Sequence, residues 1–131
     1  MIVSINRFAQ RADRNSPEIV KELRKMGAVV AIIGQPVDLM VSFNNRWLPI
    51  EIKDPQSPSA AMKRIQMQFV VKATAPIAVI CDIDAAIAFV RDGESYAITL
   101  QEKIEIQKWL KDNPDEKKLA LNTFWRLIGR M

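Results

Sequence analysis

The stretch VDLMVSFNNRWLPIEIKD, residues 37–54, decides the fold of this 131-residue chain. Two apolar runs flank the dipeptide Asn44-Asn45, which is typical of a tight β-hairpin turn because asparagine tolerates a positive φ. Residues 37–43 and 47–53 are therefore predicted to form two neighbouring antiparallel strands.

Three charges interrupt the apolar pattern of this hairpin. Asp38 lies early in the first strand, and Glu51 and Lys53 lie late in the second. Because side chains alternate between the two faces of a strand, Glu51 and Lys53 share one face, while Ile50 and Ile52 point to the other. Pairing about the Asn-Asn turn places Asp38 opposite Glu51. Two carboxylates at that separation repel each other unless a cation lies between them.

A divalent cation that prefers oxygen ligands, Mg²⁺ or Mn²⁺, would relieve this repulsion. Lys53 beside it could hold or deprotonate a water, so the three residues suit metal-assisted hydrolysis of a phosphodiester. A solvated strand face with a surface salt bridge is the alternative explanation of Glu-x-Lys. The register of Asp38, the apolar residues at the other strand positions and a helix-borne Glu18 favour the catalytic interpretation.

Apolar spacing and turn residues predict the remaining elements. Further strands are expected at residues 28–33 and 77–81. Helices are expected at 16–26, from Met62 to Ala73 with Ser57 or Ser59 as the cap, at 85–91, and in two segments after Thr99 that are parted at Asn113-Pro114. The expected buried residues of these last two segments are Ile104, Trp109, Leu110, Leu119, Phe124, Trp125 and Ile128. The chain is therefore predicted to have an α/β fold with four strands flanked by helices, in one domain, because no linker or repeat divides it.

Composition excludes several classes of protein. The chain has no histidine and one cysteine, Cys81, which rules out the usual zinc sites, a Ser-His-Asp triad and an internal disulfide. No apolar run has transmembrane length and no signal peptide is recognisable, so we expect a cytoplasmic protein without membrane contact. The formal net charge of +4 permits a nucleic-acid partner without requiring one.

The chain resembles the PD-(D/E)XK nuclease superfamily in the order of its expected elements. This order is a helix with Glu18, a strand, a PVD strand, an IEIK strand, a helix and a strand. Within this superfamily, the chain is most similar to the small virus-type replication-repair nucleases (VRR-NUC), which are related to Holliday-junction resolvases. The resemblance covers residues 11–90 and implies a restriction-endonuclease-like core with a central mixed four-stranded sheet. Residues 99–131 would form a C-terminal helical extension of a single nuclease domain.

The resemblance implies catalytic roles for Glu18, Asp38, Glu51, Lys53 and Gln66. Gln66 matches a glutamine that family members often carry in the helix after the third strand, although a solvated helix residue explains it equally well. The implied ligands of Mg²⁺ or Mn²⁺ are Asp38, Glu51, the backbone carbonyl of Ile52, and Glu18, the last directly or through a water.

The function implied is that of a metal-dependent DNA endonuclease, selective for branched, flap or Holliday-junction DNA in phage replication, recombination or repair. Such a protein would work in the cytoplasm of a bacterial host. The alternative is a catalytically inactive DNA-binding or assembly module that retains the nuclease fold. Two features support the alternative: the chain has no histidine, and Val37 separates Pro36 from Asp38, whereas the commonest family pattern has proline directly before aspartate.

DNA and a second copy of the chain are the expected partners. The residues expected to contact DNA phosphates are Arg11, Arg14, Lys63 and Arg64. These residues flank Glu18 and Gln66, although charged helix faces usually serve only solvation. A junction nuclease needs two active sites, which a twofold homodimer supplies. The apolar tail would either form the dimer contact or cover the open face of the sheet.

Overall fold

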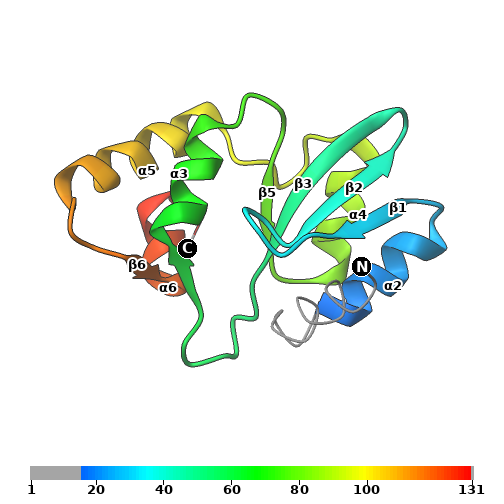
Figure 1. Ribbon diagram of the computed structural model, residues 1–131, viewed down its shortest axis with the longest axis horizontal. Helices are drawn as coiled ribbons and strands as arrows, with labels where there is room; N and C mark the ends of the chain where they lie inside the picture. Colours follow the sequence, from blue (N-terminus) through cyan, green and yellow to red (C-terminus); the bar gives the residue numbers. More distant parts are fainter. Residues whose placement is uncertain (1–15, 131) are drawn as a thin grey trace. The chain divides into compact units, whose positions relative to one another are not determined.

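The computed structural model describes residues 16–130, which form two compact units (Figure 1). The first unit contains residues 16–54 and Ala75–Ala97, and the second contains Pro55–Thr74 and residues 98–130. Both units contain helices and strands, and the expectation of a single nuclease domain stays a prediction. No helix of the described part is both long and apolar enough to cross a membrane.

A four-stranded mixed sheet forms the centre of the first unit, as predicted. Its strands, in spatial order, are β1 (Val29–Ile32), β2 (Leu39–Phe43), β3 (Arg46–Ile52) and β5 (Ala78–Ile80). The first three are antiparallel neighbours, whereas β5 runs parallel to β3. The chain between β3 and β5 includes part of the second unit, which provides the long connection that a parallel pair requires.

The predicted Asn-Asn turn joins β2 to β3. Asn44 and Asn45 have φ angles of 53° and 61°, as in a type I′ turn, whose twist matches that of the flanking strands. The ladder places Leu39 opposite Ile50, so the predicted register is confirmed. Strand β2 begins at Leu39, two residues later than predicted, and the carbonyl of Asp38 just before it accepts hydrogen bonds from the amides of Ile33 and Gly34.

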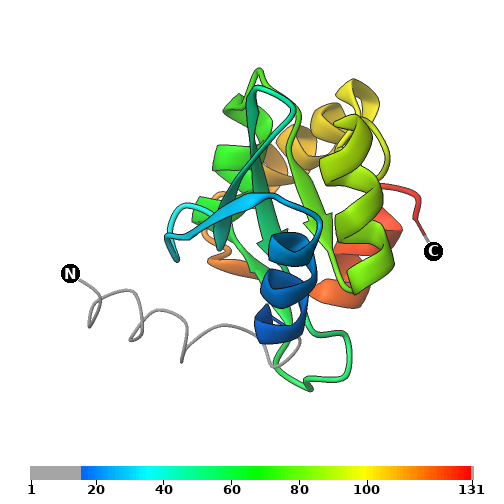
Figure 2. The same cartoon turned by 90° about the vertical axis from the view of Figure 1, so that its right-hand side faces the viewer.

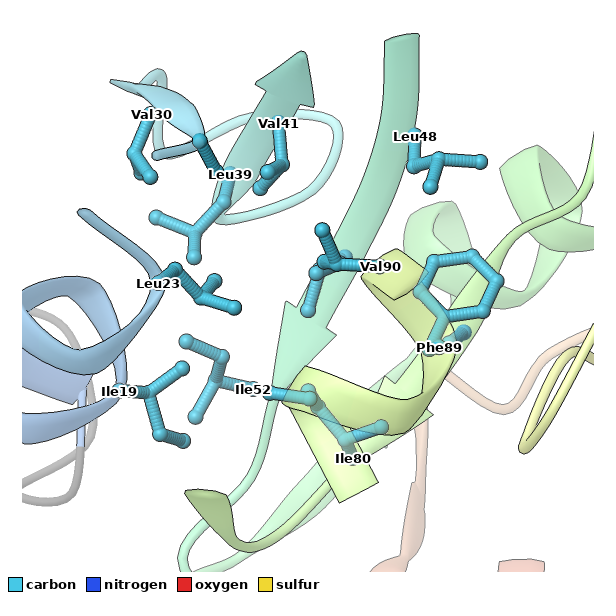
Figure 3. Packing of buried hydrophobic residues seen from close by; sticks show 14 of the residues in the cluster. Ile19, Leu23, Val30, Leu39, Val41, Leu48, Ile52, Ile80, Phe89 and Val90 are labelled. Atoms are coloured by element: carbon cyan, nitrogen blue, oxygen red, sulfur yellow. The ribbon is translucent and has the colours of Figure 1, made fainter. Parts of the chain in front are cut away.

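Helices α2 (Ser16–Lys25) and α4 (Ile83–Asp92) pack against each other and cover one face of this sheet (Figure 2). Both predicted helices are confirmed. Each is followed by a glycine with positive φ, Gly27 at 96° and Gly93 at 70°, a conformation that glycine adopts without Cβ strain. Apolar side chains from the strands and both helices form one buried cluster (Figure 3), which includes Ile19, Leu23, Val41, Ile50, Ile52, Ile80 and Phe89.

The second unit contains a two-stranded ribbon and three helices. Strand β4 (Ala61–Lys63) pairs antiparallel with β6 (Lys118–Ala120). The helices are α3 (Arg64–Lys72), α5 (Leu100–Asp112) and α6 (Leu121–Leu127). The two helices predicted for the tail are thus confirmed, and the ribbon between their sequences is a feature that the sequence did not predict.

The start predicted for the helix after β3 is wrong. Neither Ser57 nor Ser59 caps it, and their hydroxyls lie 3.2 Å apart in a hydrogen bond with each other. Met62 is fully buried in β4, opposite Leu119 of β6. Pairing with a distant part of the chain therefore overrides the helical spacing of Met62, and α3 begins only after the ribbon.

The burial predicted for the tail is partly correct. Four of the expected residues are buried: Leu110, Leu119, Phe124 and Ile128. Trp109 and Trp125 are half-buried. Ile104 is 51% exposed, so its prediction is wrong. The buried residues of α5 recur at four-residue intervals from Glu102 through Ile106, and Ile104, two residues away from each, lies on the other side of the helix.

Candidate active site

Asp38 is held at the end of β2 next to β3. Its Oδ2 accepts a hydrogen bond from the backbone amide of Ile52 at 2.8 Å. Since Leu39 faces Ile50 in the ladder, the register continues to Asp38 opposite Glu51, as the sequence predicted. The carboxylate is half-buried and has a fixed donor, so its orientation does not depend on bulk water.

Glu51 and Lys53 form a buried ion pair on the face of β3 opposite the core cluster. Lys53 Nζ lies 3.0 Å from Glu51 Oε2, and the two residues are 2% and 8% exposed. The alternative of a solvated strand face is therefore wrong for this pair. Removing two charges from water is costly, and apolar side chains often stabilise such a position as well or better. A contribution to stability therefore explains this buried pair poorly, and its burial favours a functional role.

The backbone of Ile52 also faces Asp38. Its N–H donates to Asp38, whereas the N–H of Lys53 donates to the carbonyl of Ile80 in β5 at 2.9 Å. The N–H and C=O of one strand residue point to the same edge, so the Ile52 carbonyl is also directed to the Asp38 side. Asp38, Glu51 and this carbonyl therefore present oxygen atoms at one end of the hairpin.

These oxygen donors fit a hard divalent cation. Mg²⁺ is usually bound through one or two carboxylates, while water and substrate phosphates complete its shell. Within residues 16–130, no group of three or more His, Cys, Asp or Glu side chains is arranged to hold a metal ion. Because the donors on this hairpin are oxygen atoms, they would suit Mg²⁺ or Mn²⁺ better than zinc, which prefers nitrogen and sulfur ligands.

Glu18 lies in the first turn of α2, with its side chain exposed. The next residue, Ile19, belongs to the same core cluster as Ile52, and Figure 3 shows the two side chains at the same end of the sheet. The first turn of α2 is therefore anchored near the end of β3 that carries Glu51. Its role as a metal ligand stays a prediction.

Sequence reasoning missed a further carboxylate at this end of β3. Asp54 directly follows Lys53 and is 9% exposed, although the run DPQSPS predicted only a turn. The signal available in the sequence was a charge next to the Glu-x-Lys motif. Asp54 is therefore an additional acidic candidate for the site.

Gln66 belongs to the second unit, in the first turn of α3. Its Oε1 accepts a hydrogen bond from the backbone N–H of Lys63 at 2.9 Å, which caps the start of that helix. This contact gives Gln66 a structural purpose that its sequence position did not reveal. A catalytic role for Gln66 stays a prediction.

The residues expected to contact DNA differ in their surroundings. The side chain of Lys63 is exposed, whereas that of Arg64 is half-buried. Arg64 donates hydrogen bonds of 2.7 to 3.1 Å to the backbone carbonyls of Leu110, Asn113 and Glu116. Its guanidinium therefore stabilises the end of α5, in addition to any role toward DNA. Arg11 and Arg14 lie outside the described residues.

Comparison with known proteins leaves the family of this chain open. No family model, curated protein or solved structure matches it. The resemblance to the nuclease superfamily therefore stays a prediction that depends on the residues of the hairpin and their arrangement.

Proposed function

We propose that this protein is a metal-dependent DNA endonuclease of the PD-(D/E)XK superfamily, with a restriction-endonuclease-like core. The main support is the buried Glu51–Lys53 pair beside Asp38, at one end of a mixed sheet. Stability explains this pair poorly, and its residue types and strand positions match the motif of the superfamily.

Asp38, Glu51 and the Ile52 carbonyl would hold Mg²⁺ or Mn²⁺, and Glu18 would contribute directly or through a water. A divalent cation supplies Lewis acidity that activates water and offsets negative charge on the scissile phosphate. The Ile52 amide keeps the Asp38 carboxylate oriented. The Lys53 ammonium can donate to a water or a phosphate oxygen while it contacts Glu51.

The substrate that we propose is branched, flap or Holliday-junction DNA. Paired cuts across a junction need two active sites, for which a twofold homodimer is the simplest arrangement. A role in phage replication, recombination or repair, in the cytoplasm of a bacterial host, belongs to the same proposal. Light scattering would support the dimer by a doubled mass, whereas a monomeric mass would favour cleavage of single sites.

A catalytically inactive DNA-binding or assembly module is the second candidate. Val37 separates Pro36 from Asp38, and the chain has no histidine. Such a module would bind DNA and leave it uncut in the presence of either metal.

Cleavage assays with Mg²⁺ or Mn²⁺ on labelled duplex, flap and junction DNA test the proposal. We expect cleavage by the wild type and by Glu94→Gln, which changes an exposed glutamate of the same unit. Glu51→Gln should show no cleavage, because a neutral amide is a poor ligand for a hard cation, and circular dichroism should show that it is folded. Full activity of Glu51→Gln would contradict the assigned site, and binding without cleavage by the wild type would favour the inactive module.

A further inference from the structure

The second unit has a basic hollow beside its ribbon. The hollow has a volume of about 440 Å³ and is lined by Lys63, Arg64, Ile65, Gln68, Lys117 and Lys118. Four of these six residues carry a positive charge, and none carries a negative charge. A hollow with this lining attracts anions.

The ribbon places like charges opposite each other. Lys63 and Lys118 are cross-strand partners, and both side chains are exposed. The Arg64 amide donates to the carbonyl of Lys117 at 2.7 Å, which brings the next two basic residues together. Like charges directly opposite each other destabilise a pair of strands. Within residues 16–130, none of the ion pairs involves Lys63, Lys117 or Lys118. A bound anion would therefore relieve the repulsion between these lysines.

A second hollow continues the basic lining along α3. It has a volume of about 560 Å³, shares Arg64 and Gln68 with the first, and also contacts Lys72 and Lys111. Helix α3 has 9 residues, which corresponds to a length of about 13 Å. Duplex DNA carries one charge per roughly 1.7 Å of its axis, so several phosphates fit along this length.

Arg64 contributes a positive charge in a fixed position to this surface. Its guanidinium is held by backbone carbonyls near the end of α5, so it adds positive charge without a flexible side chain. Ile65, at 59% exposure, is the large exposed aliphatic residue of the first hollow. One such residue among several lysines suits a phosphate backbone better than a membrane surface, which binds broader apolar faces.

We propose that Lys63, Lys72, Lys111, Lys117 and Lys118, here called the basic track, bind the phosphodiester backbone of DNA. This contact lies wholly in the second unit and needs neither cleavage nor a metal ion. The inference rests on the proposed function for the identity of the polyanion, and it names where the second unit holds the substrate.

Fluorescence anisotropy of a labelled DNA duplex, with full-length protein in EDTA and at several salt concentrations, tests this surface. The track variant combines Lys63→Gln, Lys117→Gln and Lys118→Gln. A matched control combines Lys21→Gln, Lys108→Gln and Arg126→Gln, which are exposed residues outside both hollows. Each variant lowers the net charge by the same amount, so total charge cannot explain a difference between them.

We expect the track variant to bind at least about tenfold more weakly than the control, with a salt slope smaller by about 2 to 3, because three phosphate contacts are lost. Equal affinity of the two variants, or no DNA binding by the wild type, would overturn the proposal. Tight binding to anionic lipid vesicles that depends on the track, without DNA binding, would assign it to a membrane and equally overturn it.

The cleavage assay separates this inference from the proposed function. If Glu51→Gln loses cleavage but the track variant binds DNA like the control, the nuclease proposal stands and the track proposal fails. If the track variant loses binding while the wild type leaves DNA uncut, the track proposal stands and the nuclease proposal fails.

Discussion

Replacement of Lys53 by methionine isolates the buried ion pair of β3. Methionine has a similar length and no charge, so the change leaves the Glu51 carboxylate, in a residue that is 2% exposed, without the cation 3.0 Å away. Removal of one partner of a buried pair typically costs about 3–5 kcal/mol, because the remaining charge is desolvated and uncompensated. We therefore expect Lys53→Met to lower the free energy of unfolding by an amount in this range.

Urea unfolding, followed by circular dichroism without divalent metal, measures this loss. The double variant Glu51→Gln/Lys53→Met should recover most of it, because neither charge is then buried. Lys21→Met, at an exposed position of α2, serves as the control and should change the unfolding free energy by less than about 0.5 kcal/mol.

Mn²⁺ extends the same experiment to the metal site. If Asp38 and Glu51 hold a cation, Mn²⁺ should stabilise the wild type by about 2.7 kcal/mol at a concentration one hundred times its Kd. It should stabilise Lys53→Met more, because the cation compensates the charge that Lys53 no longer balances. A Lys53→Met variant as stable as the wild type would refute the ion-pair argument, and unfolding of both proteins unaffected by Mn²⁺ would refute the metal site.

Two further predictions concern single carboxylates. Asp38→Asn should remain as stable as the wild type without metal, because its amide oxygen can still accept the hydrogen bond from the Ile52 amide. Asp38→Ala should lower the free energy of unfolding by about 1–3 kcal/mol. Urea unfolding compares the two variants, and equal stability of both would contradict a structural role of this hydrogen bond. Burial disfavours the charged form of Glu102, but hydrogen bonds from Arg130 and Thr99 outweigh this and lower its pKa. The stability that these contacts give is therefore present above the ordinary pKa of glutamate and is lost as the pH falls through the lowered value. Urea unfolding across the acid range should show a smaller loss for Glu102→Gln, and identical pH profiles would count against this linkage.

Interactions between residues close in the sequence predicted much of the structure of the first unit. The Asn44-Asn45 turn and the alternation of the flanking residues predicted the hairpin, its register and the shared face of Glu51 and Lys53. These predictions succeeded because turn geometry and strand alternation act between neighbouring residues, and a two-residue turn leaves little choice of register. The position of Asp38 beside β3 followed from the same rule.

Tertiary structure alone decided what covers each element and which distant segments pair. Met62 lies in a strand because residues 118–120 pair with it, and no local signal in residues 57–63 reports a partner so far along the chain. The sequence by itself determined that Glu51 and Lys53 lie on one face of a hairpin strand next to Asp38. Their burial, like the exposure of Ile104, was decided only by the folded chain, because solvent access depends on all the segments that pack around a residue.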